Sequence, residues 1–393
     1  MNPKRFKTMK IISNLYVPLV FLFIYSCQNS ETKKPVSSPK DSVNQGKSEI
    51  KPDQLFNDFA QLISGKMEKL PENIDKKYYE LFSKQLDRKL LEIEASRLSP
   101  LTKWNVNILK RNSINDTNTV FYPFSGGDFL HVNSLYPNAN HYVMMAREKV
   151  GSIPDLAKMD QYQTKEYIEA ADFILRDIYA KSYFITMNMI EDTKTSPVNG
   201  MLPILLWSVS RTGHTVTAVE EVKVDANGNK SYSPFKIGEN SSTAVRISFG
   251  NPEKGILKTL TYYSCDISNS GIENDKSIAA ILKQLPPSNC FVKSASYLMH
   301  YETFETIRKT ILEKAIYLVQ DDTGIPYKYF DKTKFNLELY GKYVKPIADF
   351  SSTLFQPDMA EAFKSKEYMG NLPFSLGYHW QTKDQNQMIA IKK

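Results

Sequence analysis

A glycine turn followed at a distance by an acidic residue is the pattern in this sequence that most directly suggests ligand chemistry. Gly126 and Gly127 follow a bulky apolar run, and Glu148 lies 21 residues beyond Gly127. Glycines after a strand let a ligand approach the backbone, and an acid about 20 positions later can accept a ribose hydroxyl. Because Ser125 and Asp128 belong to the same turn, these five residues are predicted to bind a ligand together.

The segment Tyr122–Asp128 resembles the cofactor loop of Rossmann-type methyltransferases. The resemblance covers residues 119–148 and implies S-adenosylmethionine as the cofactor, with Glu148 reading its ribose. It departs from the family pattern because the first strand carries no acid and two glycines replace three. That cofactor is made in the cytoplasm, so a transferase stays an alternative, beside a fold that keeps its turn glycines for chain geometry alone.

Ser125 allows a second enzymatic alternative, a serine hydrolase. A nucleophile elbow needs Gly-x-Ser-x-Gly because small residues must flank the strained serine. Here Pro123 and Gly127 stand in the flanking places, so half of the motif is present. The candidate bases are His214, His300 and His379. The simpler interpretation of Ser125 is a turn or N-cap residue that satisfies helix N–H groups.

Asp128 and His131 are three residues apart and would share one face of a short helix. Such a pair suits a metal or acid–base chemistry, but one pair without further ligands does not make a metal centre. A capping or solvated role is the simpler interpretation, and no metal site is predicted.

Asp321 and Asp322 follow the apolar run 316–320 and are predicted to join the same ligand-binding edge. The alternative is an Asx-turn with Gly324 at positive φ. Acids on this edge would repel an anion, so a polyhydroxylated or cationic ligand is expected rather than a phosphate. Gly127 is expected to lie open to this ligand, so that valine there would block it.

Composition favours a small molecule or a glycan over a nucleic acid. The net charge is +7, but four of the basic residues precede residue 27 with no acid among them, which leaves about +3 for the rest. The 23 tyrosines and 21 phenylalanines include candidates for stacking on sugars, although most lie in apolar runs that suit a core. The leading hypothesis is therefore a protein of unknown activity that binds a small molecule or glycan.

The N-terminus resembles the export signal of bacterial lipoproteins. Basic residues precede an apolar run that closes on Ser26-Cys27, which predicts a signal peptide over residues 1–26 and lipid on Cys27. Residues 27–52 are polar and are predicted to be a disordered tether. The implied partner is a membrane, and the implied location is the cell envelope, facing the periplasm or the cell surface. The alternative is an uncleaved membrane anchor.

The body of the chain resembles an uncharacterised group of bacterial envelope proteins. The residues that carry this resemblance are 121–129, 293–300 and 320–326. It implies one family fold over most of residues 116–380, and no activity or cofactor.

Two cysteines remain once Cys27 is assigned to lipid. Export places Cys265 and Cys290 in an oxidising compartment, so a disulfide between them is predicted. Two buried free thiols are the alternative. Zinc is not expected, because the two cysteines have no nearby histidine pair.

The elements needed to position these residues follow from apolar periodicity. Leucines and phenylalanines at helical spacing predict a helical lead-in over residues 53–115, before an α/β domain over 116–393. Residues 119–124, 129–135 and 141–146 predict a βαβ unit, and runs at 244–249 and 257–263 predict a β-hairpin insertion. The fold class expected is therefore α/β, with a Rossmann-like, mainly parallel sheet.

Overall fold

The computed structural model describes residues 51–112, 118–183, 196–238, 242–251, 255–379 and 384–393. The predicted signal peptide, Cys27 and nearly all of the tether lie outside the described residues. The strands are β1 (Thr119–Pro123), β2 (His141–Ala146), β3 (Thr215–Val224), β4 (Lys230–Pro234), β5 (Ala244–Asn251), β6 (Ile256–Ser264), β7 (Ser288–Val292), β8 (Ala315–Gln320), β9 (Phe335–Gly341), β10 (Tyr368–Gly370) and β11 (Asn386–Lys392). The longer helices are α1 (Gln54–Ile63), α2 (Lys76–Ile93), α3 (Ser99–Arg111), α4 (Phe129–Leu135), α5 (Gln161–Ile174), α6 (Arg176–Lys181), α8 (Leu202–Arg211), α9 (Asn269–Asn274), α10 (Lys276–Gln284), α11 (Glu305–Lys314) and α12 (Pro357–Ala362).

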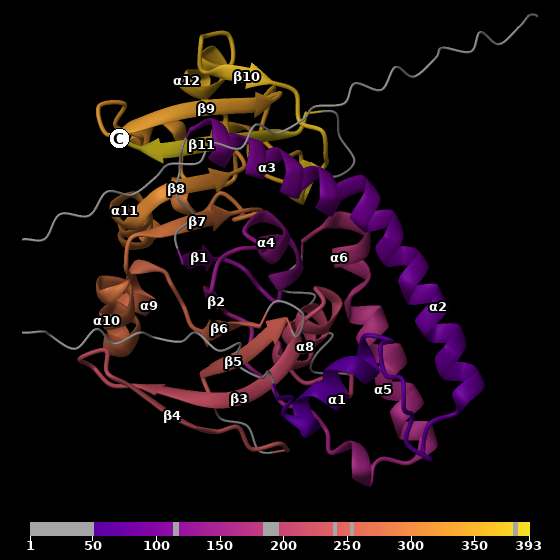
Figure 1. The fold of residues 1–393 in the computed structure, drawn as a ribbon. Helices are drawn as coiled ribbons and strands as arrows, with labels where there is room; N and C mark the ends of the chain where they lie inside the picture. Colours follow the sequence, from indigo (N-terminus) through magenta and orange to yellow (C-terminus); the bar gives the residue numbers. More distant parts are fainter. Residues whose placement is uncertain (1–50, 113–117, 184–195, 239–241, 252–254, 380–383) are drawn as a thin grey trace, which may run out of the picture. The chain divides into compact units, whose positions relative to one another are not determined.

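One mixed sheet joins all the described strands, and the prediction of a Rossmann-like, mainly parallel sheet is wrong. The order is β10-β9-β11-β8-β7-β1-β2-β6-β5-β3-β4 (Figure 1). Five of its ten described strand pairings are antiparallel, two of them made by β11 with β8 and β9. The sequence reasoning missed β9 and β11 because their pairing joins segments far apart in the chain, where local periodicity gives no signal.

The predicted βαβ unit is confirmed. β1 and β2 are parallel over their length, from Thr119 opposite His141 to Pro123 opposite Met145, with α4 between them. The predicted hairpin between β5 and β6 is also present. It is not an insertion, however, because the other edge of β6 pairs in parallel with β2 and extends the central sheet.

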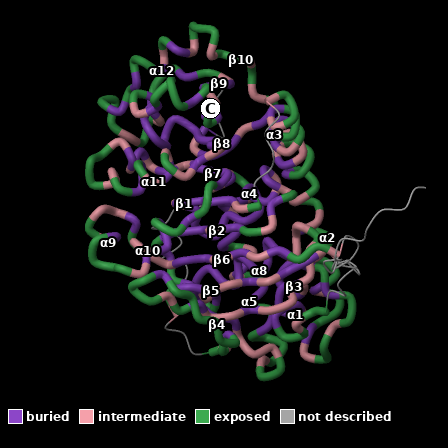
Figure 2. Tube along the Cα trace, turned by 60° about the vertical axis from the view of Figure 1, so that its left-hand side comes forward, coloured by how far each residue is buried: buried purple, intermediate pink, exposed green. Residues whose placement is uncertain are grey.

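Helices cover both faces of the sheet, as the alternation of buried side chains requires. On β1, Val120 and Tyr122 enter one apolar core with residues of α1 to α6 and α8, whereas Phe121 enters a second core with residues of α9 to α12. β7 is accordingly buried along its length, and β1, β2 and β6 are mostly buried toward the ends that face the cavity (Figure 2). A ligand can therefore reach the central strands only at their ends.

The helical lead-in packs on the rest of the fold. The N–H of Asp53, which caps α1, donates to the carbonyl of Val216 on β3 at 2.9 Å. The N–H of Val216 in turn donates to the Asn57 side chain at 3.2 Å. Residues 54–63 therefore close over the start of β3 instead of standing apart from the sheet.

Gly127 faces α8 rather than open space, so the expectation that it admits a ligand is wrong. A Cβ on Gly127 would lie 2.9 Å from Cγ2 of Ile204 and 3.3 Å from Sδ of Met201. Glycine is required here because the turn after β1 approaches α8 closely.

We predict that Gly127→Ala lowers the free energy of unfolding by about 1–3 kcal/mol, because the new methyl group overpacks against Ile204. Urea denaturation of the wild type, Gly127→Ala, Ile204→Ala and the double variant measures this cost. Removing Cγ2 should relieve the contact, so the double variant should lose less stability than the two single losses added together. Strict additivity would show that Gly127 does not depend on Ile204.

Candidate functional site

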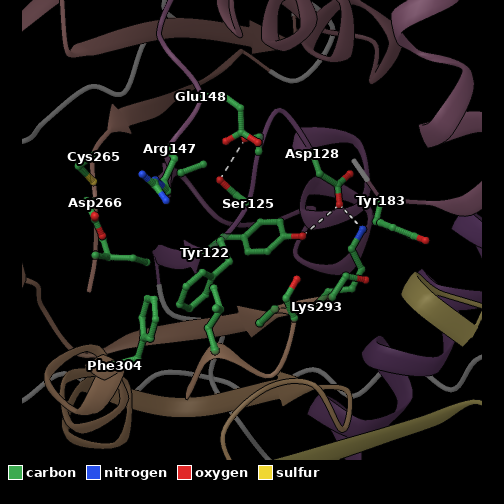
Figure 3. Close-up of a pocket in the computed structure, with 18 of the residues that line it drawn as sticks. Tyr122, Ser125, Asp128, Arg147, Glu148, Tyr183, Cys265, Asp266, Lys293 and Phe304 are labelled. Carbon is green, nitrogen blue, oxygen red and sulfur yellow. Dashed lines mark hydrogen bonds and ion pairs between the residues drawn. The ribbon is translucent and has the colours of Figure 1, made fainter. Parts of the chain in front are cut away.

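A cavity of about 400 Å³ opens at the edge of the sheet where β1, β2, β6 and β7 end (Figure 3). Its lining combines charged, hydroxyl and aromatic side chains with the turn after β1. The lining residues are Tyr122, Phe124, Ser125, Gly126, Asp128, Ala146, Arg147, Glu148, Tyr183, Cys265, Asp266, Ile267, Ser268, Lys293, Ser294, Ala295, Ser296, Leu298, Phe304 and Tyr378. This volume lies within the range of small-molecule sites.

The cavity lies where the chain changes direction across the sheet. β1 pairs in parallel with β2 on one side and with β7 on the other. In the sheet, β2 and β6 lie on one side of β1, whereas β7 and β8, which come later in the chain, lie on the opposite side. The segments that leave β1 and β7 therefore diverge, and α/β sheets bind ligands in the crevice that such a divergence opens.

The turn after β1 forms one side of the cavity with a strained backbone. Phe124 has φ of 58° and Gly126 has φ of 51°. The N–H of Ser125 donates to the carbonyl of Met145 on β2 at 3.1 Å, which fixes the turn to the neighbouring strand. Gly126 thus lines the cavity, whereas Gly127 does not.

Ser125 has no imidazole partner among the described residues. Its hydroxyl donates only to main-chain carbonyls, those of Gly126 at 3.1 Å and Met145 at 3.4 Å. Of the candidate bases, His379 contacts Asp322 at 2.8 Å, and neither it nor His214 or His300 lines the cavity. The geometry therefore does not support a nucleophilic serine.

Asp128 lines the cavity, but its oxygens are held by a buried network. It accepts from Nδ1 of His131 at 2.7 Å, from the Tyr122 hydroxyl at 3.2 Å and from Nζ of Lys293. Nζ of Lys293 also donates to the carbonyl of Ser182. The side chains of Asp128, His131 and Lys293 are at most 2% exposed. Asp128 therefore shapes the site and caps α4, as its simpler interpretation predicted.

The charge states in this network follow from burial and pairing. Burial lowers the pKa of His131 to about 4, against the opposing effect of Asp128, so the imidazole is neutral at neutral pH. Burial would raise the pKa of Asp128, but His131 and Lys293 outweigh it and lower that pKa to about 2. Burial also lowers the pKa of Lys293, while the Asp128 carboxylate opposes the shift. Asp128 is therefore an anion whose main cationic partner is Lys293.

The second predicted acid, Glu148, lies where the sequence placed it. It follows the end of β2, is buried and lines the cavity. The Tyr262 hydroxyl on β6 donates to its main-chain carbonyl at 2.6 Å, which fixes the backbone there. This arrangement presents a carboxyl group beside the turn after β1.

Sequence reasoning missed Asp266 and Lys293 among the lining residues. Asp266 follows β6, and the N–H of Ser268 donates to it at 2.8 Å and lowers its pKa. The available signal was position, since Lys293 directly follows β7 and Asp266 lies two residues after the end of β6. Because β6 was predicted to be part of an insertion, the position of Asp266 after a central strand was not recognised.

The loop after β7 forms the opposite wall, and its backbone is strained. Ser294, Ser296 and Tyr297 have φ of 53°, 53° and 56°. The other non-glycine residues with positive φ in the described chain are Phe124, in the cavity wall, and Ser182, whose carbonyl accepts from Lys293. Phe124, Ser294 and Ser296 therefore line one cavity, and Ser182 contacts Lys293 in its lining. Strain of this kind clusters at ligand clamps and active sites.

Asp321 and Asp322 reach the same edge of the sheet but do not line the cavity. Both are fully buried after β8. Asp321 accepts from the N–H of Ser294, and Asp322 accepts from the Tyr297 hydroxyl at 2.5 Å. They lie behind the loop after β7, so the structure separates them from Glu148 and the turn after β1.

The predicted disulfide is wrong, because Cys265 and Cys290 are free thiols. Cys265 follows β6 and Cys290 lies in β7, with β2 and β1 between these strands. Three strand spacings are about 14 Å, whereas bridged cysteines have Cα atoms within about 7 Å. Burial raises the pKa of Cys265 to about 12, which makes this thiol unreactive although it lines the cavity.

Comparisons with known proteins assign no family to this chain. No protein-family model matches the chain, and no curated protein matches it significantly. Within the described ranges, no helix is long and apolar enough to cross a bilayer. The described residues also contain no group of three or more histidine, cysteine or acidic side chains placed to hold a metal ion.

We predict that Lys293→Met lowers the free energy of unfolding by about 3–5 kcal/mol, because it leaves the Asp128 carboxylate buried without its cation. Urea denaturation measures the loss. The double variant Lys293→Met/Asp128→Asn should be more stable than the two single losses predict, since no charge is then stranded. Glu361→Gln, in an exposed pair with Lys364, is the matched control and should change stability by less than about 0.5 kcal/mol. An equally small effect of Lys293→Met would contradict this account of the network.

Proposed function

We propose that this chain binds a nucleoside-type small molecule in the cavity, with S-adenosylmethionine as the prototype. The observation that carries the proposal is the junction of the strained turn after β1 with the buried carboxyl group of Glu148, at the point where the sheet changes direction. In α/β sheets this junction is suited to a ribose, because the turn admits the ligand and the acid accepts its hydroxyl hydrogens.

The residues present fit a ligand of this class. The cavity of about 400 Å³ accommodates a nucleoside with a short tail. Glu148 is placed to accept from ribose hydroxyls, and Asp266 and Ser268 offer polar atoms beside Ile267 at the end of β6. Phe124 and Phe304, with ring centroids 6.1 Å apart, add aromatic surface at the rim.

The charge of the lining selects against polyphosphates. Three acids, Asp128, Glu148 and Asp266, exceed the two bases, Arg147 and Lys293, and Lys293 is already paired with Asp128. The Asp128 side chain also occupies the first turn of α4, where a phosphate would otherwise accept from N–H groups. A neutral or cationic tail, such as a sulfonium, therefore suits this cavity better than a triphosphate.

A glycan is the second candidate, because a tyrosine pair lines the mouth of the same cavity. The rings of Tyr183 and Tyr378 lie 4.6 Å apart between centroids. Aromatic faces of this kind can pack against sugar rings.

We further propose that the chain is a cell-envelope lipoprotein held at a membrane through lipid on Cys27. The support is the basic and apolar segment that ends at Ser26-Cys27, followed by the polar segment 27–52. Export would remove the protein from the cytoplasmic pool of S-adenosylmethionine, so the proposal extends to related nucleosides that carry no polyphosphate.

We predict that S-adenosylmethionine or adenosine binds with measurable affinity in isothermal titration calorimetry, and that Glu148→Gln weakens binding at least about tenfold. The amide replaces one of the two carboxyl oxygens that can accept from ribose hydroxyls with an N–H donor. Glu361→Gln, at an exposed position on α12, should leave affinity unchanged. ATP should bind more weakly than adenosine. Binding by maltose-type oligosaccharides alone would favour the glycan candidate, and binding unaffected by Glu148→Gln would refute the assigned ribose contact.

We predict that fatty-acid label enters the full-length chain in bacteria and is lost in Cys27→Ala. The thiol is the attachment point, and several acyl chains are needed for stable membrane association. Metabolic labelling followed by gel autoradiography measures incorporation, with Cys290→Ala as the matched control. Persistent label in Cys27→Ala would exclude the lipoprotein assignment.

A further inference from the structure

We propose that the turn Asp321–Thr323 after β8 is a positioning element for the cavity, because it holds the loop 294–297 in the left-handed conformations that form the cavity wall. This inference rests on the proposed function, since it assigns what keeps that ligand site in shape. Asp321 and Thr323 are therefore positioning residues, and neither is expected to touch a ligand.

The turn satisfies the loop by direct hydrogen bonds to successive residues. The N–H of Ser294 donates to Oδ2 of Asp321 at 2.9 Å. The N–H of Ala295 donates to Oγ1 of Thr323 at 2.8 Å. The N–H of Tyr297 donates to the carbonyl of Thr323 at 3.2 Å, and its hydroxyl donates to Asp322 at 2.5 Å. The conformation of the loop is thus held by hydrogen bonds to the turn that follows the neighbouring strand, β8.

The turn after β8 can hold the loop after β7 because β7 and β8 are parallel neighbours whose ends are in register. Val292 lies opposite Gln320, so the loop after β7 and the turn after β8 leave the sheet side by side. Asp321 is itself held rigidly. Its Oδ1 accepts from the N–H of Thr323 at 3.0 Å and from the Thr323 hydroxyl. The Asp321 carboxylate therefore holds the turn through Oδ1 and the loop through Oδ2.

A third segment, near the C-terminus, closes on the loop from another direction. Gly377 has φ of 67°, and a Cβ there would lie 2.6 Å from Oγ of Ser294 and 3.1 Å from Oδ2 of Asp321. The next residue, Tyr378, lines the cavity and its hydroxyl lies 2.7 Å from Oγ of Ser296. The wall of the cavity is thus held between the turn and the C-terminal segment.

These contacts explain how the strain at Ser294, Ser296 and Tyr297 persists. Left-handed conformations are unfavourable for residues with a Cβ, and they survive where surrounding contacts over-determine them. Burial, followed by the neighbouring Asp322, raises the pKa of Asp321, and its carboxyl oxygens accept from the N–H groups of Ser294 and Thr323 and from the Thr323 hydroxyl. Loss of one acceptor should release the loop without removing any residue that faces the ligand.

The chain supplies a matched control for this carboxylate. Asp331 and Thr333 repeat the same local turn, in which Oδ1 of Asp331 accepts from the N–H of Thr333 at 2.9 Å and from its hydroxyl at 2.6 Å. That turn is exposed and does not line the cavity. Asp331→Asn therefore makes the same chemical change as Asp321→Asn without any contact to the loop 294–297.

Hydrogen–deuterium exchange with mass spectrometry on the full chain tests the mechanical part of the inference without a ligand. In Asp321→Asn the amides of peptides that span 294–297 should exchange at least about tenfold faster than in the wild type, and in Asp331→Asn they should be unchanged. The isosteric Thr323→Val, which lacks the acceptor for Ala295, should also accelerate exchange, while Thr323→Ser should restore wild-type protection. Unchanged exchange in both Asp321→Asn and Thr323→Val would overturn the proposal.

Calorimetry with S-adenosylmethionine and adenosine tests the consequence for binding. Asp321→Asn and Thr323→Val should weaken binding at least about tenfold, and Thr323→Ser and Asp331→Asn should not. Faster loop exchange with unaltered affinity would also overturn the proposal, because the loop would then not shape the site. Failure of the wild type to bind either probe would count against the proposed function, and the exchange result would still decide whether the turn holds the loop.

Discussion

The parallel pairing of β1 with β2 on one side and β7 on the other is the constraint on which the candidate site depends. Pairing in register fixes the strand ends, so that Pro123 on β1 lies opposite Met145 on β2. The chain must then turn away from β1 and β7 in different directions, and the space between the two departing segments becomes the cavity. Because both faces of these strands are buried under helices, polar groups converge at this edge of the sheet, around the cavity.

Buried polar contacts convert that space into a defined site. The Lys293 side chain extends from the end of β7 to Asp128, which follows β1 on the opposite wall of the cavity. Neither side chain is more than 2% exposed. A charge at such depth is tolerated only when it is paired, so this ion pair fixes the distance between the two walls. Asp321 and Thr323 act similarly behind one wall, where they satisfy the N–H groups of a strained loop. Rigid walls of this kind favour selective binding, because little conformational freedom is lost when a ligand enters.

The outer strands enlarge the sheet without contributing to the cavity. β3, β4 and β5 extend one side through antiparallel pairings, and β9, β10 and β11 extend the other. Their effect on the site is indirect, since Asn386 at the start of β11 accepts from the N–H of Asp322 at 2.9 Å and so steadies the turn after β8. The cavity is therefore supported from both halves of the sheet although four central strands form it.

The sequence by itself determined the local elements and the first half of the site. Apolar periodicity and turn residues located the βαβ unit at 119–146, and the spacing from Gly127 placed Glu148 at the correct strand end, because these signals arise between residues close in the chain. Only the tertiary structure decided that Lys293 meets Asp128 across 165 residues, that Asp321 supports the wall from behind, and that Cys265 and Cys290 stand too many strands apart to pair. Strand order and the direction of β11 likewise depend on pairings between distant segments. Their energies come from burial and hydrogen bonds that exist only once the sheet has formed, and no local pattern records them.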